Sequence, residues 1–174
     1  RSATVYSAGF SEMATKEGHQ LESQLLKALE ETGIAISGPN CLGNLSARAN
    51  LLTLPDDRLR ELVPGPVAMV GQSGTVAPGI ARTLIDRGID VGYVVTSGNE
   101  TGLAAADYID YFTTDNDVRL IFCLIEAVRR PKDFLKACEA ARDKGVPVVA
   151  LKVGASEKGR VATLAHTGSL AGSI

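Results

Sequence analysis

Short apolar runs alternate with amphipathic stretches along the whole chain. The apolar runs are dominated by Val, Ile, Leu and Ala, and few polar positions interrupt them. Runs of this kind are typical of parallel strands that are covered on both faces of a sheet. We therefore expect strands at residues 3–8, 34–37, 67–71, 91–96, 118–124 and 146–153.

The stretches between these runs have the apolar spacing of one face of a helix. They predict helices at residues 17–32, 76–87, 103–112 and 132–144. Gly33, Gly88 and Gly145 stand at the ends of three of them, where a glycine commonly stops a helix. Alternating strands and helices predict an α/β fold with a doubly wound parallel sheet.

The interval 42–64 breaks this rhythm. It has no clear periodicity, contains Pro55, Asp56 and Asp57, and leads into Pro64-Gly65-Pro66. We expect a linker there, with residues 1–41 as the last part of a Rossmann-like domain and residues 65–174 as a nearly complete flavodoxin-like domain. Because the chain lacks an initial Met and opens almost at once on an apolar run, we expect a piece of a longer protein.

Composition and charge exclude several classes of partner. With 174 residues, 45% of them hydrophobic, the chain can bury a substantial core. The net charge of −2, with basic and acidic residues interspersed, argues against nucleic acid or an anionic membrane as a partner. Three widely spaced cysteines indicate neither a disulfide framework nor a zinc site. Because the apolar runs are far shorter than the ~20 residues of a membrane span and no secretory signal is visible, we expect a cytoplasmic protein.

The sharpest local motif is Met69-Val-Gly-Gln-Ser-Gly-Thr75, an apolar strand that runs through a Gly/Ser turn into a helix. Free backbone N–H groups and the positive end of the helix would face an anion there, and the hydroxyls of Ser73 and Thr75 could add hydrogen bonds. A phosphate suits this arrangement. An ordinary capped turn between a strand and a helix has the same sequence features.

A second motif, Ala165-His166-Thr-Gly-Ser-Leu-Ala-Gly172, places one of two histidines in a loop of small residues after the last expected strand. Small residues let backbone amides approach a charged group, and imidazole is a nucleophile near neutral pH. Because α/β sheets bind ligands at the carboxyl ends of their strands, this loop and the Ser73 turn should share one rim. The alternative is that the histidine of this loop has no functional role. We expect the other histidine, His19, to have a surface role, because it stands at the polar start of a helix.

Two further strands end in residues that could reach this rim. Glu126 follows an apolar strand, so its carboxylate could orient an imidazole, although a helix cap or a solvated carboxylate is equally consistent. Ser37-Gly-Pro-Asn-Cys-Leu-Gly43 is either a plain turn or the lining of a cofactor groove. Asn40 can donate and accept hydrogen bonds there, and Cys41 could lie there without being a nucleophile.

In this order and spacing, the motifs resemble the α-subunit superfamily of succinyl-CoA synthetases, and specifically the ADP-forming acyl-CoA synthetases. The resemblance covers essentially the whole chain. It is carried by Ser7-Ala-Gly-Phe10, Gly38-Pro-Asn-Cys-Leu-Gly43, Gln72-Ser-Gly-Thr75, Ser97-Gly-Asn99, residues 107–111 and His166-Thr-Gly-Ser-Leu-Ala-Gly172. The last motif is the most specific, since succinyl-CoA synthetases themselves usually have a shorter His-Ala-Gly form.

The resemblance implies a ligase whose reversible reaction converts acyl-CoA, phosphate and ADP into a carboxylic acid, CoA and ATP, through an acyl phosphate and a phosphohistidine. His166 would be the phosphorylated catalytic residue, and Glu126 the carboxylate that hydrogen-bonds to it. The phosphoryl group would be held by Ser73, Gly74 and Thr75, with Gly168 in the histidine loop.

The resemblance also assigns seven residues to coenzyme A. They are Tyr6, Ser7, Ala8, Gly9, Pro39, Asn40 and Cys41. It further implies ATP or ADP and Mg²⁺ bound mainly by an ATP-grasp domain or β subunit that this chain lacks, and assembly into a homo- or hetero-oligomer. The chain alone should therefore not catalyse the overall reaction.

The acyl group is constrained by one departure from the family pattern. Succinyl-CoA synthetases carry a Tyr soon after the Ser-Gly-Thr turn, near the acyl group, whereas this chain has Val76-Ala-Pro78. The resemblance therefore argues against succinate as the substrate. It places Pro78 near the acyl group of a smaller or more apolar acid, acetate-like or aromatic.

Two other functions remain open. A serine hydrolase would use Ser73 and His166 in the chain order of α/β-hydrolases, but its pattern requires Gly at the position of Thr75. A non-catalytic CoA-binding regulatory domain would have lost the histidine, while His166 and its loop are intact.

Overall fold

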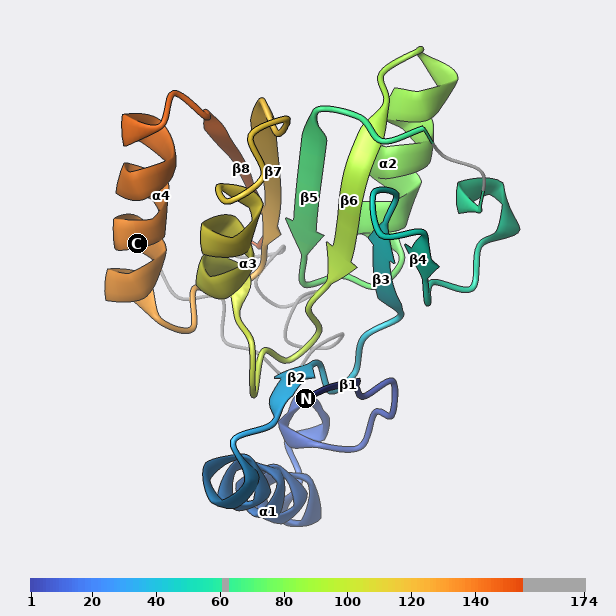
Figure 1. The fold of residues 1–174 in the computed structure, drawn as a ribbon. Coiled ribbons are helices and arrows are strands. Elements are labelled where there is room, and N and C mark those ends of the chain that lie inside the picture. Colours follow the sequence, from blue (N-terminus) through green and yellow to red (C-terminus); the bar gives the residue numbers. More distant parts are fainter. Residues whose placement is uncertain (61–62, 155–174) are drawn as a thin grey trace.

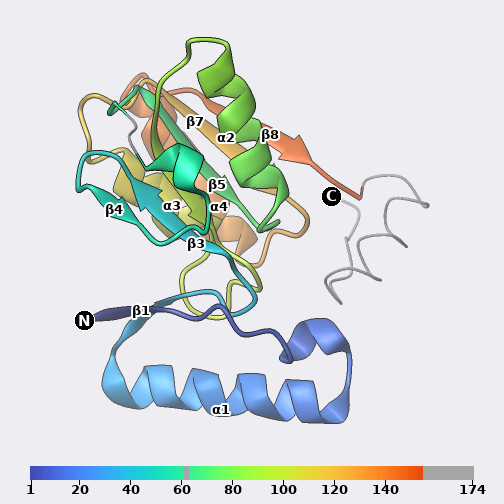
Figure 2. The same cartoon turned by 90° about the vertical axis from the view of Figure 1, so that its right-hand side faces the viewer.

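The computed structural model describes residues 1–60 and 63–154, which form a small sheet below a larger one (Figure 1). The small sheet pairs β1 (Ser2–Thr4) in parallel with β2 (Ala35–Ser37). Between these strands the chain passes through η1 (Ser11–Met13) and α1 (Lys16–Thr32), which lies at the bottom of the molecule in Figures 1 and 2.

The larger sheet has the strand order β4-β3-β6-β5-β7-β8. Its parallel strands are β5 (Val67–Gly71), β6 (Val91–Thr96), β7 (Leu120–Ile125) and β8 (Val148–Lys152). The chain passes from β5 to β6 on one side and then returns to β7 on the other side of β5. This is the flavodoxin-like order, and its switch point lies between β5 and β7, where such sheets bind ligands.

Helices cover both faces of this sheet, as Figures 1 and 2 show. The helix α2 (Val76–Asp86) lies on one face, and α3 (Ala105–Phe112) and α4 (Pro131–Asp143) lie on the other. Consecutive residues of β5 therefore point into different cores, and Ala68, Met69 and Val70 are each at most 1% exposed. The predicted doubly wound α/β class is confirmed.

The predicted helix ends are confirmed at the three glycines. Gly33, Gly88 and Gly145 each follow a helix and have φ of +64°, +77° and +74°. Most other residues avoid this left-handed region because their Cβ would clash with the backbone, so glycine stops the helix there without strain.

The interval 42–64, predicted as a linker without regular structure, contains two strands of the larger sheet. The strand β3 (Gly43–Ser46) pairs antiparallel with β6, and β4 (Leu51–Leu52) pairs antiparallel with β3; a short helix, η2 (Asp57–Leu59), follows. The prediction of a linker was wrong for these residues. Strands of two to four residues are too short to show a period. Here β3 forms because it pairs with β6 and buries Leu45, and β4 forms because it pairs with β3.

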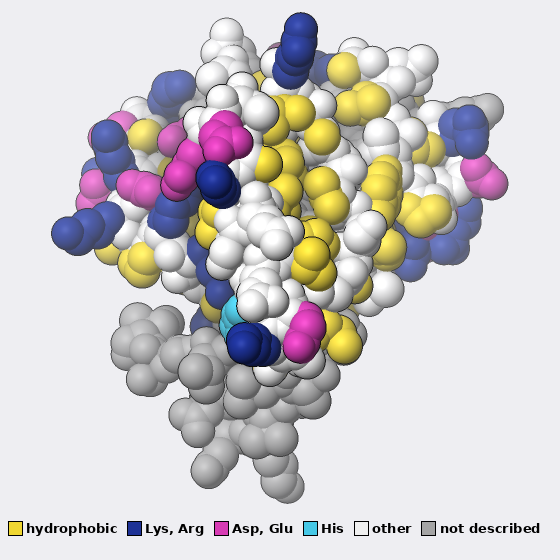
Figure 3. Space-filling view, turned by 90° about the horizontal axis from the view of Figure 1, so that it is seen from below, with side chains coloured by type: hydrophobic (Ala, Val, Ile, Leu, Met, Phe, Trp, Pro, Cys, Tyr) yellow, Lys and Arg dark blue, Asp and Glu magenta, His cyan; other side chains and the backbone are white. Residues whose placement is uncertain are grey.

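Apolar side chains are exposed on the lower face of the molecule (Figure 3). On α1, Leu21 is 47% and Leu26 is 42% exposed, and Met13 in the preceding turn is 57% exposed. Gathered apolar surface of this kind is typical of a region that contacts further protein. Among the described residues, no helix is long and apolar enough to cross a membrane.

Candidate functional site

The turn after β5 leads into α2 and presents unbonded backbone donors. Ser73 is 8% exposed; its Oγ accepts the N–H of Val76 at 3.3 Å, and its carbonyl accepts the N–H of Ala77 at 3.4 Å. The N–H groups of Gly74 and Thr75 have no acceptor among residues 1–60 and 63–154. Because N–H groups at the start of a helix attract anions, the turn can bind a phosphate group.

A glycine is needed at position 74 because another loop approaches it closely. A Cβ on Gly74 would lie 2.8 Å from Cγ of Leu42. Leu42 is fixed by its own N–H, which donates to Oγ1 of Thr96 at 2.9 Å. The glycine therefore lets the loop after β2 reach the rim of the larger sheet beside the anion-binding turn.

Glu126 lies beside this turn because Gln72 holds the two loops together. The Oε1 of Gln72 accepts the N–H groups of Glu126 at 2.7 Å and Ala127 at 2.9 Å, and its Nε2 donates to the carbonyl of Ala127 at 2.6 Å. Glu126 is 8% exposed, and its carbonyl accepts a hydrogen bond from Nζ of Lys152 at 3.0 Å. The backbone of Glu126 is thus fixed at the switch point, on the same rim as the turn.

A cavity of about 130 Å³ opens next to the turn. Its apolar walls are formed by Leu42, Leu54, Pro55 and Pro78, and its polar side is formed by the turn itself together with Asp56 and Arg82. Arg82 donates a hydrogen bond to Asp56, so the two charges balance each other at the cavity wall. Pro78, predicted near the acyl group, therefore lines a small apolar space that adjoins Gly74 and Thr75.

The residues predicted to contact coenzyme A lie in the loops after β1 and β2. These strands are parallel, so the two loops emerge at one edge, where the N–H of Asn40 donates to the carbonyl of Ser7 at 2.9 Å. Tyr6, Ser7 and Ala8 are exposed there.

Two of the seven residues are buried and shape the turn from inside. Pro39 is less than 2% exposed and Cys41 is 2% exposed. Burial raises the pKa of the Cys41 thiol, so this cysteine is not activated as a nucleophile. Of the seven residues, Tyr6, Ser7 and Ala8 are exposed and Asn40 is partly buried.

The loop after β6 connects the small sheet to the site. The N–H of Asn99 donates to the carbonyl of Pro39 at 2.9 Å, and Nδ2 of Asn40 donates to Oδ1 of Asn99 at 3.2 Å. Gly98 has φ of +60°, and a Cβ there would lie 2.2 Å from the carbonyl oxygen of Pro39. The candidate CoA loops are thus fixed against the rim of the larger sheet.

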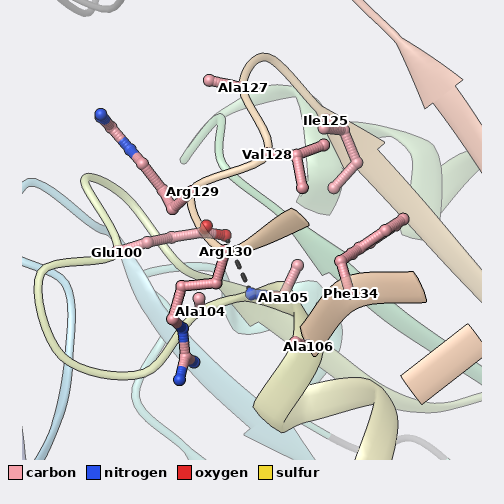
Figure 4. A pocket seen from close by; sticks show the side chains of 10 residues that line it. All are labelled: Glu100, Ala104, Ala105, Ala106, Ile125, Ala127, Val128, Arg129, Arg130 and Phe134. Atoms are coloured by element: carbon pink, nitrogen blue, oxygen red, sulfur yellow. Dashed lines mark hydrogen bonds between the residues drawn. The ribbon is translucent and has the colours of Figure 1, made fainter. Parts of the chain in front are cut away.

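The sequence analysis did not single out Gln72 and Glu100 as site residues. Glu100 is 7% exposed and accepts a hydrogen bond from Oγ of Ser97 at 2.8 Å. It also accepts the N–H of Ala105 at 3.1 Å, which Figure 4 shows as a dashed line. Gln72 directly follows β5 and Glu100 lies in the loop after β6, and a place at the carboxyl end of a parallel strand is the signal that could have identified them.

His166 and Gly168 lie outside the described residues, so their predicted roles stay predictions. His19 is exposed on α1, as predicted. Among the described residues, no group of three or more His, Cys, Asp or Glu side chains is arranged to hold a metal ion.

Comparison with known proteins agrees with this arrangement. Residues 64–174 match the family described as the succinyl-CoA ligase like flavodoxin domain. The chain is 37% identical over 172 residues to trans-feruloyl-CoA synthase FCS1 from an unknown prokaryotic organism, covering 97% of this chain and 24% of that protein. It is 33% identical over 171 residues to the α subunit of the ADP-forming acetate–CoA ligase I of Pyrococcus furiosus, covering 97% and 36%.

A solved structure supports the same relationship. The dinucleotide-forming acetyl-coenzyme A synthetase 1 of Ca. Korarchaeum cryptofilum, in complex with phosphate and ADP, superimposes with a TM-score of 0.87 and 28% identity over 100% of this chain and 37% of that one. The chain spans well under half the length of these relatives. Since the family match covers more than half of the chain, the protein belongs to the family of the succinyl-CoA ligase like flavodoxin domain.

Proposed function

We propose that this chain is the acyl-phosphate-forming part of an ADP-forming acyl-CoA synthetase. The observation that carries the proposal is the turn at Ser73, Gly74 and Thr75. Two of its N–H groups have no acceptor within the described part of the chain, and Gln72 holds Glu126 beside the turn. The relatives named as ADP-forming acetate–CoA ligase and feruloyl-CoA synthase support a reaction of this class.

In the first step, phosphate held by the turn attacks the thioester carbon of an acyl-CoA. The C–S bond breaks as a C–O bond forms, and the products are an acyl phosphate and the thiol of CoA. N–H groups at the start of α2 stabilise negative charge on the phosphate oxygens without having to reorganise. Tyr6, Ser7 and Asn40, which lie on one edge, would hold the CoA.

In the second step, the phosphoryl group passes from the acyl phosphate to His166 and the carboxylic acid leaves. A carboxylate that accepts the other ring N–H of an imidazole orients it and supports the positive charge. We assign this role to Glu126. Transfer from the phosphohistidine to ADP, with Mg²⁺, is assigned to an ATP-grasp domain or subunit beyond this chain, so the chain alone is expected not to form ATP.

The cavity beside the turn favours a compact acyl group without a second charge. Its walls are formed by Leu42, Leu54, Pro55 and Pro78, and its volume of about 130 Å³ suits a short aliphatic or small aromatic group. A second carboxylate on the substrate would gain no unpaired cation there, because Asp56 already neutralises Arg82. We therefore propose a monocarboxylic acid as the substrate.

The test is His166→Ala in the complete enzyme, with its nucleotide-binding domain or subunit present. We expect acid-labile labelling from a radiolabelled acyl phosphate or ATP in the wild type and neither labelling nor CoA-dependent ATP formation in the variant. Unchanged ATP formation by the variant would contradict the proposal. Reaction of Ser73 with a fluorophosphonate would instead favour a hydrolase.

A further inference from the structure

The apolar walls of the cavity beside the anion-binding turn differ in how firmly they belong to the core. Leu54 is 4% exposed and packs in the apolar cluster on the α2 side of the sheet, and Pro78 is buried within α2. Leu42 is 36% exposed and lies outside the two apolar clusters that the described residues form. Its side chain can therefore vary in size without repacking the core.

Two hydrogen bonds of one buried threonine fix the backbone at position 42. The N–H of Leu42 donates to Oγ1 of Thr96 at 2.9 Å, and the same hydroxyl donates to the carbonyl of Gly43 at 2.7 Å. Thr96 is fully buried and pairs with Gly43 where β3 meets β6. Because neither bond uses the side chain of Leu42, a substitution there should change the cavity wall and leave the loop in place.

The Leu42 side chain also lies directly over the turn. A Cβ on Gly74 would be 2.8 Å from Cγ of Leu42, 3.3 Å from its Cδ1 and 3.4 Å from its Cβ. The N–H groups of Gly74 and Thr75 have no acceptor among the described residues, so a phosphate bound by them would lie next to this side chain. Leu42 thus contacts the turn and at the same time forms part of the cavity wall.

Leu42 directly follows the second of the two loops proposed to bind coenzyme A. That loop, at residues 39–41, lies against the first, since the N–H of Asn40 donates to the carbonyl of Ser7 at 2.9 Å. From Leu42 the chain passes into β3 and so crosses from the small sheet to the larger one (Figure 1). Leu42 therefore joins the loops proposed for CoA to the cavity, where the thioester of an acyl-CoA would lie.

The order of bonds in an acyl-CoA determines which part of the acid would meet Leu42. The carbonyl carbon is bonded to the sulfur of CoA and is attacked by phosphate, so it must lie within reach of both the CoA loops and the turn. The next carbon of the acid then enters the cavity past Leu42. A branch at that carbon makes the acyl group wider at the point where the Leu42 side chain narrows the space.

We propose that Leu42 is a specificity-determining residue for the proposed reaction: its side chain sets how wide the acyl group can be at the carbon next to the carbonyl group. The inference rests on the proposed function of the turn and the cavity. Leu42 takes part in no chemical step. It acts by excluding acyl groups that are too wide to bring the thioester carbon to the phosphate.

The test measures kcat/KM for isobutyryl-CoA and butyryl-CoA in the complete enzyme, with phosphate, ADP and the nucleotide-binding domain or subunit present. The two acyl groups are isomers and differ only in a branch at the carbon beside the carbonyl group. In Leu42→Ala, which removes most of the side chain, we expect the ratio of isobutyryl-CoA to butyryl-CoA to rise about tenfold or more. In Leu42→Phe, which adds a ring to the wall, the ratio should fall by a similar factor.

A matched control is Leu135→Ala, at a side chain of α4 that is 63% exposed, and it should leave the ratio unchanged. If Leu42 only packed on the turn, its loss would raise KM for phosphate and lower kcat/KM for both thioesters by the same factor. A wild-type ratio in both Leu42→Ala and Leu42→Phe would therefore overturn the inference.

Calorimetric binding of the same two thioesters, without phosphate and ADP, separates this inference from the proposed function because it requires no turnover. The ratio of the two Kd values should shift in the same direction as the ratio of kcat/KM. A wild type that binds both thioesters and forms no ATP from either contradicts the proposed function, and the Kd ratio then decides the role of Leu42. A wild type that binds neither thioester overturns both.

Discussion

At the scale of single residues, Asp56 determines whether the cavity beside the turn carries a positive charge. Its Oδ2 accepts a hydrogen bond from Arg82, and its Oδ1 accepts the N–H of Arg58 at 3.2 Å. Partial burial opposes ionisation, but the contacts with Arg82 and Arg58 outweigh it and hold the pKa of Asp56 below its ordinary value. Arg82 is therefore neutralised throughout the neutral pH range.

Asp56→Asn should shift substrate selectivity toward dicarboxylic acids. The amide oxygen can still accept the N–H of Arg58, but the guanidinium of Arg82 would face the cavity with an unbalanced charge. A charge-assisted hydrogen bond contributes about 1.5–3 kcal/mol, so the ratio of kcat/KM for a short dicarboxylic acid over acetate should rise about tenfold or more. Asp57→Asn, at a side chain 91% exposed, is the control and should leave the ratio unchanged. An unaltered ratio in Asp56→Asn would remove Arg82 from the acyl site.

The sequence predicted the turn between β5 and α2 and the placement of Glu126 on the same rim. Both follow from local rules, since each comes directly after an apolar strand. The contacts of Gln72 and Glu100 could not be predicted in this way. They depend on contacts between residues such as Gln72 and Ala127, which are 55 positions apart in the chain, and the meeting of these loops is decided by sheet order.

At the scale of elements, strands with a buried apolar core were predicted well, and strands created by pairing were not. The bounds of β5 and β6 agree with their apolar runs residue for residue. In contrast, β3 contains Gly43, Asn44 and Ser46, which have low strand propensity or no apolar period. The strand β3 forms because its backbone pairs with β6. Side-chain contacts hold the turn between β3 and β4.

Asp115 provides the main contact of that turn. It forms an ion pair with Nε of Arg48 at 2.5 Å, and it accepts hydrogen bonds from the hydroxyl of Tyr93 at 2.8 Å and the N–H of Asp117 at 2.9 Å. Partial burial raises the pKa of Asp115, but these donors outweigh that effect and lower it below the ordinary value. The resulting stabilisation is present above the unfolded pKa of about 3.9 and is lost as the pH falls through the lower folded value.

Asp115→Asn should therefore destabilise the fold in a pH-dependent way. At pH 7 we expect the free energy of unfolding to fall by about 1–2 kcal/mol, because the amide keeps the geometry and loses the charge. The difference from the wild type should shrink below about pH 4 and should be measured by denaturant titration at several pH values. Asp143→Asn, at a side chain 68% exposed, should change stability little at any pH. A pH-independent difference would show that geometry, and not charge, is responsible.

At the scale of the whole molecule, Asn99 connects the small sheet to the larger one. Its Nδ2 donates to Oε2 of Glu12 at 2.5 Å, and its Oδ1 accepts from Asn40. The other oxygen of Glu12 accepts the N–H of Gly9 at 2.5 Å. The buried side chain of Asn99 therefore supports both loops that are proposed to bind coenzyme A.

Asn99→Ala should accordingly weaken CoA binding more than it weakens folding. Loss of two side-chain hydrogen bonds should lower the free energy of unfolding by about 1–3 kcal/mol. Because Asn40 and Glu12 lose their common partner, the loops at positions 6–9 and 39–41 become free to move apart, and KM for CoA should rise about tenfold while KM for phosphate stays near the wild-type value. Asn116→Ala, in an exposed turn, is the matched control and should leave both KM values unchanged. Equal increases in both KM values would instead show that Asn99 supports the whole rim, and that the CoA loops depend on other contacts.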